Sequence, residues 1–211
     1  MIGRVGARVA AGSVSAAIAL VTVGPATAHH VGTYVPKDNE ITTNFKQIKF
    51  SVQAGKFDVA LRLFETGPLH ADMRARAATL PAGLEAGLHA ALERGDGAEV
   101  ERRLMVFFAA LARDLALDAE RRTADPQLSH DARAAIGARF LEAIWRYYNL
   151  VDFAVAQRDD KTSVAVRLAF DEAAGYAKGT AAPAGLREPL ARIAQVLSVL
   201  IESSTPARRG S

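Results

Sequence analysis

Apolar residues recur every three or four positions along most of this chain, which is the spacing of one face of an α-helix. Phe45, Ile48 and Val52 form the first such stripe, and Gly55 then interrupts the pattern before a second stripe begins at Phe57. Glycine tolerates the backbone of a tight turn, so this segment is predicted to be a helix hairpin.

The later segments repeat this design. The first helix is predicted to begin at Thr42 or Thr43, because a threonine hydroxyl can cap a helix start. Two further hairpins are predicted to turn at residues 95–97 and 158–160, and no segment alternates long enough to form a strand. The pattern therefore predicts an all-α protein, an antiparallel helical bundle built from helix hairpins, with about six to seven helices after an extended N-terminal arm.

Two aromatic-rich stripes are predicted to supply one hydrophobic core. They consist of Phe45, Ile48, Phe57 and Phe64 in the first part of the chain and Phe107, Leu111, Phe140 and Ile144 in the second. Trp145 and Tyr147 flank the second stripe, and a core position is favoured for them. The alternative is a partly exposed patch that binds a partner, because Trp and Tyr are enriched at contact surfaces.

The N-terminal residues have the features of a secretion signal. Arg4 and Arg8 precede a short apolar run, and Pro25 ends that run before a small-x-small sequence at residues 26–28. A membrane span needs about 20 apolar residues, and this run is shorter. We therefore expect cleavage after Ala28 and a soluble periplasmic protein without membrane insertion, an uncleaved anchor being the alternative.

Together these patterns divide the chain into four segments. Residues 1–28 are predicted to be the cleaved signal and residues 29–40 the extended arm. Residues 41–203 are predicted to form a single helical domain, and residues 204–211 a flexible tail. The domain length agrees with the usual size of one domain, roughly 100–200 residues.

Composition excludes several kinds of chemistry and partner. The net charge of +3 includes Arg4 and Arg8, so the chain without these two carries +1, and no nucleic-acid partner is expected. The absence of cysteine excludes disulfides, thiolate zinc sites and cysteine nucleophiles. No nucleophile elbow, phosphate loop or dinucleotide fingerprint occurs, so neither an enzyme nor an organic cofactor is expected.

Two histidines directly follow the predicted cleavage site. After cleavage His29 would offer a free α-amine and an imidazole nitrogen, and His30 would add a second imidazole. Nitrogen ligands of this kind bind Cu(II) most strongly among the first-row divalent ions. The pair is therefore a candidate copper site, and the alternative is a polar start of the mature chain without a ligand role.

A further candidate ligand, His89, lies in a predicted helix between Glu85 and Glu93. Residues four apart share a helix face, so the three side chains form one row. Such a row could bind iron, manganese or zinc if a neighbouring helix adds ligands. His89 and Glu93 are therefore candidate metal ligands, and the alternative is a solvated polar stripe.

Asp114 and Asp118 also lie four apart, at a spacing where like charges repel each other. Three arginines are close in sequence and can neutralise the two carboxylates: Arg113, Arg121 and Arg122. Charge compensation by these arginines is favoured over a metal site at this position.

The run FLEAIWRYYNLVDFAVAQRDDKTSVAVRLAFDEA, residues 140–173, resembles the helical periplasmic segments found with bacterial Ftr-type iron permeases and in imelysin-like iron-uptake proteins. The shared features are long helices broken by an Arg-Asp turn and aromatic-rich helix faces. The defining motifs, Arg-Glu-x-x-Glu and Gly-x-His-x-x-Glu, are absent from the sequence. The resemblance implies a role in metal uptake.

Two functional hypotheses follow. In the first, the chain is a periplasmic helical accessory protein that binds or delivers a transition metal, iron or copper, for a membrane transport system. Its partner would be a membrane transporter or another periplasmic protein. In the second, it is a periplasmic helical protein–protein interaction module without a metal.

Overall fold

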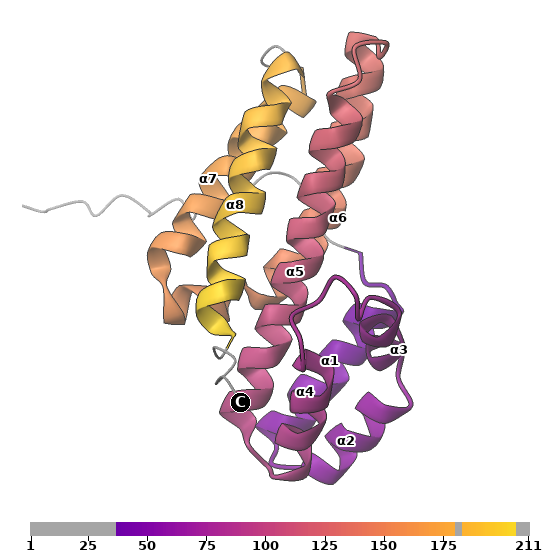
Figure 1. Cartoon of the computed structure of the whole chain (residues 1–211), viewed down its shortest axis with the longest axis vertical. Helices are drawn as coiled ribbons and strands as arrows, with labels where there is room; N and C mark the ends of the chain where they lie inside the picture. Colours follow the sequence, from indigo (N-terminus) through magenta and orange to yellow (C-terminus); the bar gives the residue numbers. More distant parts are fainter. Residues whose placement is uncertain (1–36, 180–182, 206–211) are drawn as a thin grey trace, which may run out of the picture. The chain divides into compact units, whose positions relative to one another are not determined.

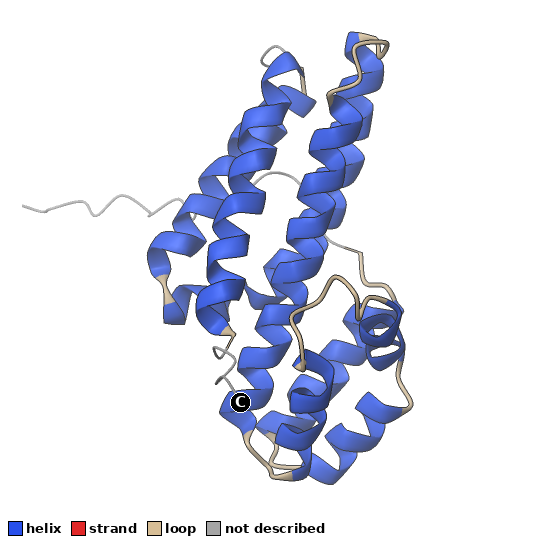
Figure 2. Cartoon of the chain, viewed as in Figure 1, coloured by secondary structure: helices blue, strands red, loops and turns tan. Residues whose placement is uncertain are grey.

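Helices form almost all of the chain that the structure describes (Figure 2). This computed structural model describes residues 37–179 and 183–205. Within those ranges there is no β-strand, which confirms the all-α prediction, and there are eight α-helices rather than the expected six to seven. They are α1 (Glu40–Gln53), α2 (Phe57–Glu65), α3 (Pro68–Ala75), α4 (Leu84–Glu93), α5 (Gly97–Thr123), α6 (His130–Arg158), α7 (Asp160–Ala177) and α8 (Arg187–Ser204), with a 3₁₀ turn at Pro183–Leu186 before α8.

Helix α5 is the centre of the arrangement (Figure 1). It packs lengthwise along α6 and α8, and α7 packs against both of these helices, so α5 to α8 form an antiparallel four-helix bundle. Helices α1 to α4 pack on one another and meet the N-terminal part of α5. None of the helices in the described ranges is both long and apolar enough to cross a membrane.

The start of α1 differs from the prediction. Asn39 is the N-cap, because its Oδ1 accepts a hydrogen bond from the backbone N–H of Thr42 at 2.9 Å. Thr42 Oγ1 accepts one in return from the backbone N–H of Asn39 at 2.8 Å, which completes a capping box. The prediction of Thr42 or Thr43 as cap was wrong because asparagine and threonine both suit this position, and the hydrophobic pattern does not distinguish them.

The turn between α6 and α7 is shorter than the predicted segment 158–160. Asp159 alone separates the two helices, and it is the N-cap of α7. Its Oδ1 accepts a hydrogen bond from the backbone N–H of Thr162 at 3.3 Å, and its Oδ2 accepts one from the Thr162 hydroxyl at 2.7 Å. A single well-capped residue therefore reverses the chain here.

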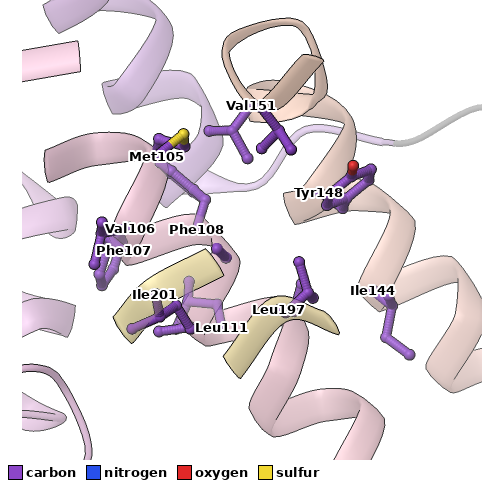
Figure 3. Packing of buried hydrophobic residues seen from close by; sticks show 14 of the residues in the cluster. Met105, Val106, Phe107, Phe108, Leu111, Ile144, Tyr148, Val151, Leu197 and Ile201 are labelled. Carbon is purple, nitrogen blue, oxygen red and sulfur yellow. The ribbon is translucent and has the colours of Figure 1, made fainter. Parts of the chain in front are cut away.

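One hydrophobic core runs through the eight described helices, and Figure 3 shows the part of it where α5 faces α6 and α8. Six of the eight predicted core residues are buried: Phe45, Ile48, Phe64, Phe107, Leu111 and Ile144. Phe57 and Phe140 are only partly buried, which corrects the prediction for these two. Phe57 covers the turn at Gly95, where an added Cβ would lie 3.5 Å from its ring, and the Arg122 guanidinium carbon lies 5.6 Å from the centre of the Phe140 ring.

The two flanking aromatic residues are part of the packing. Trp145 is buried, and its ring centre lies 5.0 Å from that of Phe170 on α7. Tyr147 is half-buried, and its hydroxyl accepts a hydrogen bond from Asn39 Nδ2 at 3.1 Å. The core position favoured for Trp145 is therefore confirmed, and Tyr147 ties α6 to the start of α1.

Glu99 binds two arginines at the start of α5. Its Oε1 accepts hydrogen bonds from Arg102 Nη2 at 2.5 Å and from Arg103 Nε at 2.6 Å. Arg102 also donates to the carbonyl of Ser204 at the end of α8, and Arg103 donates to the carbonyl of Gly83 before α4 at 3.0 Å. The hydrogen bond from Arg102, and then that from Arg103, lowers the pKa of Glu99 to about 2.

Replacing Glu99 by glutamine is expected to remove a pH-dependent part of the stability. Because the folded pKa of about 2 lies below the ordinary value of 4.5, ionised Glu99 stabilises the fold fully above about pH 4.5 and loses this effect as the pH falls toward 2. The difference in free energy of unfolding between wild type and Glu99→Gln, measured by urea denaturation, should therefore shrink from about pH 5 downward. A difference that stays constant with pH would contradict this assignment.

Candidate functional site

The predicted metal ligands fall into two groups in the structure. His29 and His30 lie outside the described residues. His89 and Glu93 lie on α4, where the sequence predicted a helix. In the described part of the chain, no group of three or more His, Cys, Asp or Glu side chains is arranged to hold a metal ion.

The geometry around His89 explains why its carboxylates do not converge on one point. Its Nε2 lies 2.9 Å from Glu65 Oε1 on α2, whereas its Nδ1 lies 3.5 Å from Glu93 Oε2. The two ring nitrogens point in different directions, so an ion bound at one of them cannot also bind the carboxylate at the other. The third member of the predicted row, Glu85, pairs instead with His70 of α3, with 2.7 Å between Glu85 Oε1 and His70 Nε2.

These two histidine–carboxylate pairs connect α2, α3 and α4 above the buried ring of Phe64. The ring centre of Phe64 lies 4.6 Å from that of His70 and 6.5 Å from that of His89. The hydrogen bond with Glu65 and the charges of Glu93 and Glu65 raise the pKa of His89. A bound proton competes with a metal for an imidazole nitrogen, so a raised pKa favours ion pairing with the carboxylates over metal binding.

The acidic pair on α5 is neutralised as the sequence predicted. Arg113 Nη2 lies 2.7 Å from Asp114 Oδ1. Arg121 and Arg122 contact the two oxygens of Asp118 at 3.2 and 3.0 Å. Charge compensation therefore accounts for both aspartates.

A buried polar cluster joins α6 to α7. Asp152 accepts a hydrogen bond from the Ser163 hydroxyl at 2.8 Å and forms an ion pair with Arg167. The Tyr148 hydroxyl lies in the same environment, where burial and then the charge of Asp152 raise its pKa. Asp152 and Ser163 are both buried, so a substrate has no access to this serine, and the cluster stabilises the contact between the two helices.

The most distinctive surface feature is an apolar groove between α1, α5 and α6. It encloses a cavity of about 80 Å³, several times the roughly 10–15 Å³ that one water molecule needs. Its apolar lining comes from three helices far apart in sequence: Phe45 and Val52 of α1, Val100, Leu104 and Met105 of α5, and Leu150, Val151 and Ala154 of α6. We call this feature the α1/α5/α6 groove.

A second depression continues this groove along α5 and α6. It shares Glu101, Met105 and Ala154 with the first cavity and extends to Phe153 and Arg158. Phe153 is 70% exposed, which is unusual for an aromatic side chain of this size. An exposed aromatic ring thus lines a depression of mixed polarity that joins the apolar cavity at Met105 and Ala154.

Two opposite charges border the groove. The Nζ of Lys49 on α1 lies 5.9 Å from the centre of the Phe45 ring. Glu101 of α5 lines both depressions. The ion pairs formed among the described residues include neither Lys49 nor Glu101. Both charges are therefore available to a binding partner.

Phe153 and Phe50 were not predicted as surface aromatics, although the sequence contains a signal for them. Phe153 does not continue the buried stripe of Ile144, Tyr148 and Val151, because it lies about 200° around the helix from Val151 at 100° per residue. Phe50, which is 67% exposed, falls outside the buried stripe of α1 for the same reason. A large aromatic residue on the polar face of a helix is the feature that marks both positions.

The geometry thus presents an apolar groove with an aromatic rim, two histidine–carboxylate pairs and a buried aspartate cluster. Protein-family models, curated proteins and solved structures were all compared with the chain, and none of them matches it.

Proposed function

We propose that this chain is an exported helical protein–protein interaction module that binds its partner through the α1/α5/α6 groove. The observation that carries the proposal is the exposed ring of Phe153 beside an open apolar cavity. Binding interfaces concentrate their energy in a few aromatic side chains and the pockets next to them. The function is binding, with no catalytic step.

The energetics favour occupation of this site. Full burial of a phenylalanine side chain contributes about 1.5–3 kcal/mol, and Phe153 has most of that gain still available. The groove walls add apolar surface from Leu150 and Met105. Lys49 and Glu101 place one positive and one negative charge at the border of the groove. The partner expected for such a site presents an aromatic or aliphatic side chain with charged neighbours.

An apolar fluorescent probe should detect the groove in dilute protein. Anilinonaphthalene sulfonate, which fluoresces on apolar surface, is expected to bind the wild type. Ala154 lines both depressions, so Ala154→Phe should fill them and weaken probe binding about tenfold. The matched control on the same helix is Ala135→Phe at an exposed position, which should bind the probe like the wild type. Equal binding by Ala154→Phe would count against the groove as a binding site.

The second candidate function is the metal-delivery role expected from the sequence. The observation in its favour is that His89, whose side chain is 31% exposed, has one carboxylate at each ring nitrogen, which offers a single ion one imidazole nitrogen and one carboxylate. A protein that exposes a free amine at His29 would add the His29–His30 pair as a separate site. We propose this role for iron or copper, with a membrane transporter or another periplasmic protein as the recipient.

Copper titration tests the metal proposal. Cu(II) should bind the mature protein more tightly at about pH 7.5 than at pH 5, because the imidazole proton competes with the metal. Replacing His29 and His30 by alanine should abolish this binding, as should acetylation of the N-terminal amine. Replacing His89 and Glu93 by alanine should remove only a weaker site, which ferrous iron can also probe. Equally weak binding in every variant would exclude metal delivery.

A further inference from the structure

We infer that the partner seated on the α1/α5/α6 groove is a second copy of this chain, in a two-fold symmetric dimer. This inference rests on the proposed function, because it names the occupant of the same groove. In a two-fold interface the same patch of both copies is in contact, so the patch must be complementary to itself. The groove has this property in shape and in charge.

Phe153 is the protruding part of this patch. Its side chain projects from the outer face of α6, next to the cavity lined by Ala154 and Met105. One patch therefore carries both a protruding ring and an apolar hollow of about 80 Å³. A two-fold rotation places Phe153 of each copy against the hollow of the other, and both rings become buried at once.

Lys49 and Glu101 are charged residues of opposite sign in this patch. They lie on different walls of the groove, α1 and α5, and neither belongs to an ion pair among the described residues. A two-fold arrangement can bring Lys49 of one copy to Glu101 of the partner subunit, and the symmetry repeats the contact. Lys49 and Glu101 carry opposite signs, so each can find its counter-charge on the other copy. Arg158, which donates to the carbonyl of Ser203, adds one positive charge in the second depression.

Exposed apolar residues elsewhere lack this combination. Leu168 on α7 is 63% exposed and Val199 on α8 is 59% exposed, yet neither lines the cavities described above. Exposed apolar side chains without an adjoining cavity are common on protein surfaces. They therefore serve as controls for the groove rather than as a second docking face.

Sedimentation velocity over a dilution series tests the dimer. The wild type is expected to dimerise with a dissociation constant in the micromolar range or below. Phe153→Asp should weaken dimerisation at least about 100-fold, since it puts a charge into an apolar hollow. The matched control Leu168→Asp, which makes the same change at an exposed site on α7, should dimerise like the wild type. Circular dichroism should show unchanged helicity in both variants.

Charge exchange gives an independent readout. Lys49→Glu and Glu101→Lys should each weaken the dimer about tenfold, because each places like charges together across the interface. The double variant should recover to within about threefold of the wild type, because the pair is restored with its signs reversed. Failure of the double variant to recover would overturn the pairing of Lys49 with Glu101.

The outcomes separate this inference from the proposed function. A wild type that stays monomeric up to about 100 μM, or a dimer unaffected by Phe153→Asp, would overturn the second copy as occupant. If the dilute monomer still binds anilinonaphthalene sulfonate in the groove, the interaction function stands and a different protein is the partner. If probe binding is also absent, both proposals fail. With a dimer present, the probe should be excluded from concentrated wild type and retained by Phe153→Asp.

Discussion

Replacing Phe107 by alanine is expected to lower the free energy of unfolding by about 3–5 kcal/mol. Phe107 is completely buried in α5, the helix that packs against α6 and α8 and also against α4. Its ring centre lies 5.1 Å from that of Phe108, in an edge-to-face contact. The loss combines the transfer free energy of the ring with the cavity left behind, because a close-packed interior relaxes only partly.

Urea denaturation of the full chain provides the measurement for Phe107→Ala. The matched control is Phe153→Ala, which removes the same atoms from a side chain that is 70% exposed. In dilute protein this control should change the stability by no more than about 0.5 kcal/mol. A loss below about 1 kcal/mol for Phe107→Ala would mean that the buried face of α5 is assigned wrongly.

Replacing Asp152 by alanine is the second substitution with a large expected effect, about 2–4 kcal/mol. Asp152 is 6% exposed, and its carboxylate is the acceptor for both Ser163 and Arg167. Its removal leaves the buried Ser163 hydroxyl without this acceptor and Arg167 without its counter-ion. The arginine side chain is 45% exposed and can turn to water, so the loss should stay below that for a fully buried ion pair.

Two further variants show whether the burial of Asp152 causes this effect. Asp152→Asn keeps an oxygen acceptor for Ser163 and should recover part of the lost stability. Glu142→Ala removes a carboxylate from the same helix, but its ion pair with Arg146 is partly solvent-exposed and spaced i,i+4. That control should cost at most about 1 kcal/mol. Equal losses for Asp152→Ala and Glu142→Ala would show that the cluster adds nothing beyond a surface ion pair.

Helix positions and most of the core could be predicted from the sequence. Hydrophobic period alone assigned Phe45, Ile48 and Ile144 to buried faces, since a helix places every third or fourth residue on one side. The period could not show that Phe57 would cover a turn and remain partly exposed. Exposure of a residue near a helix end depends on which neighbouring segment covers it, and local spacing carries no information about that neighbour.

Fewer features of the candidate sites could be predicted from the sequence. Spacing brought Glu85, His89 and Glu93 onto one predicted row, but α2 and α3 supplied Glu65 and His70 as the closest partners. The order in which helices pack decided which carboxylate reached which imidazole nitrogen. A pairing of this kind follows from side chains on different helices, and the sequence spacing of one helix cannot contain it.

The sequence by itself determined that this protein is helical, where most helices lie and which faces are apolar, because these properties follow from backbone geometry and residue spacing within single segments. Only the tertiary structure decided that α1, α5 and α6 meet around a hollow with Phe153 at its edge. The hydrophobic effect is non-directional, so it favours the burial of every apolar helix face but does not determine which faces pack together. The choice among packings, and with it the groove, depends on the fit of side chains from three helices that lie far apart along the chain.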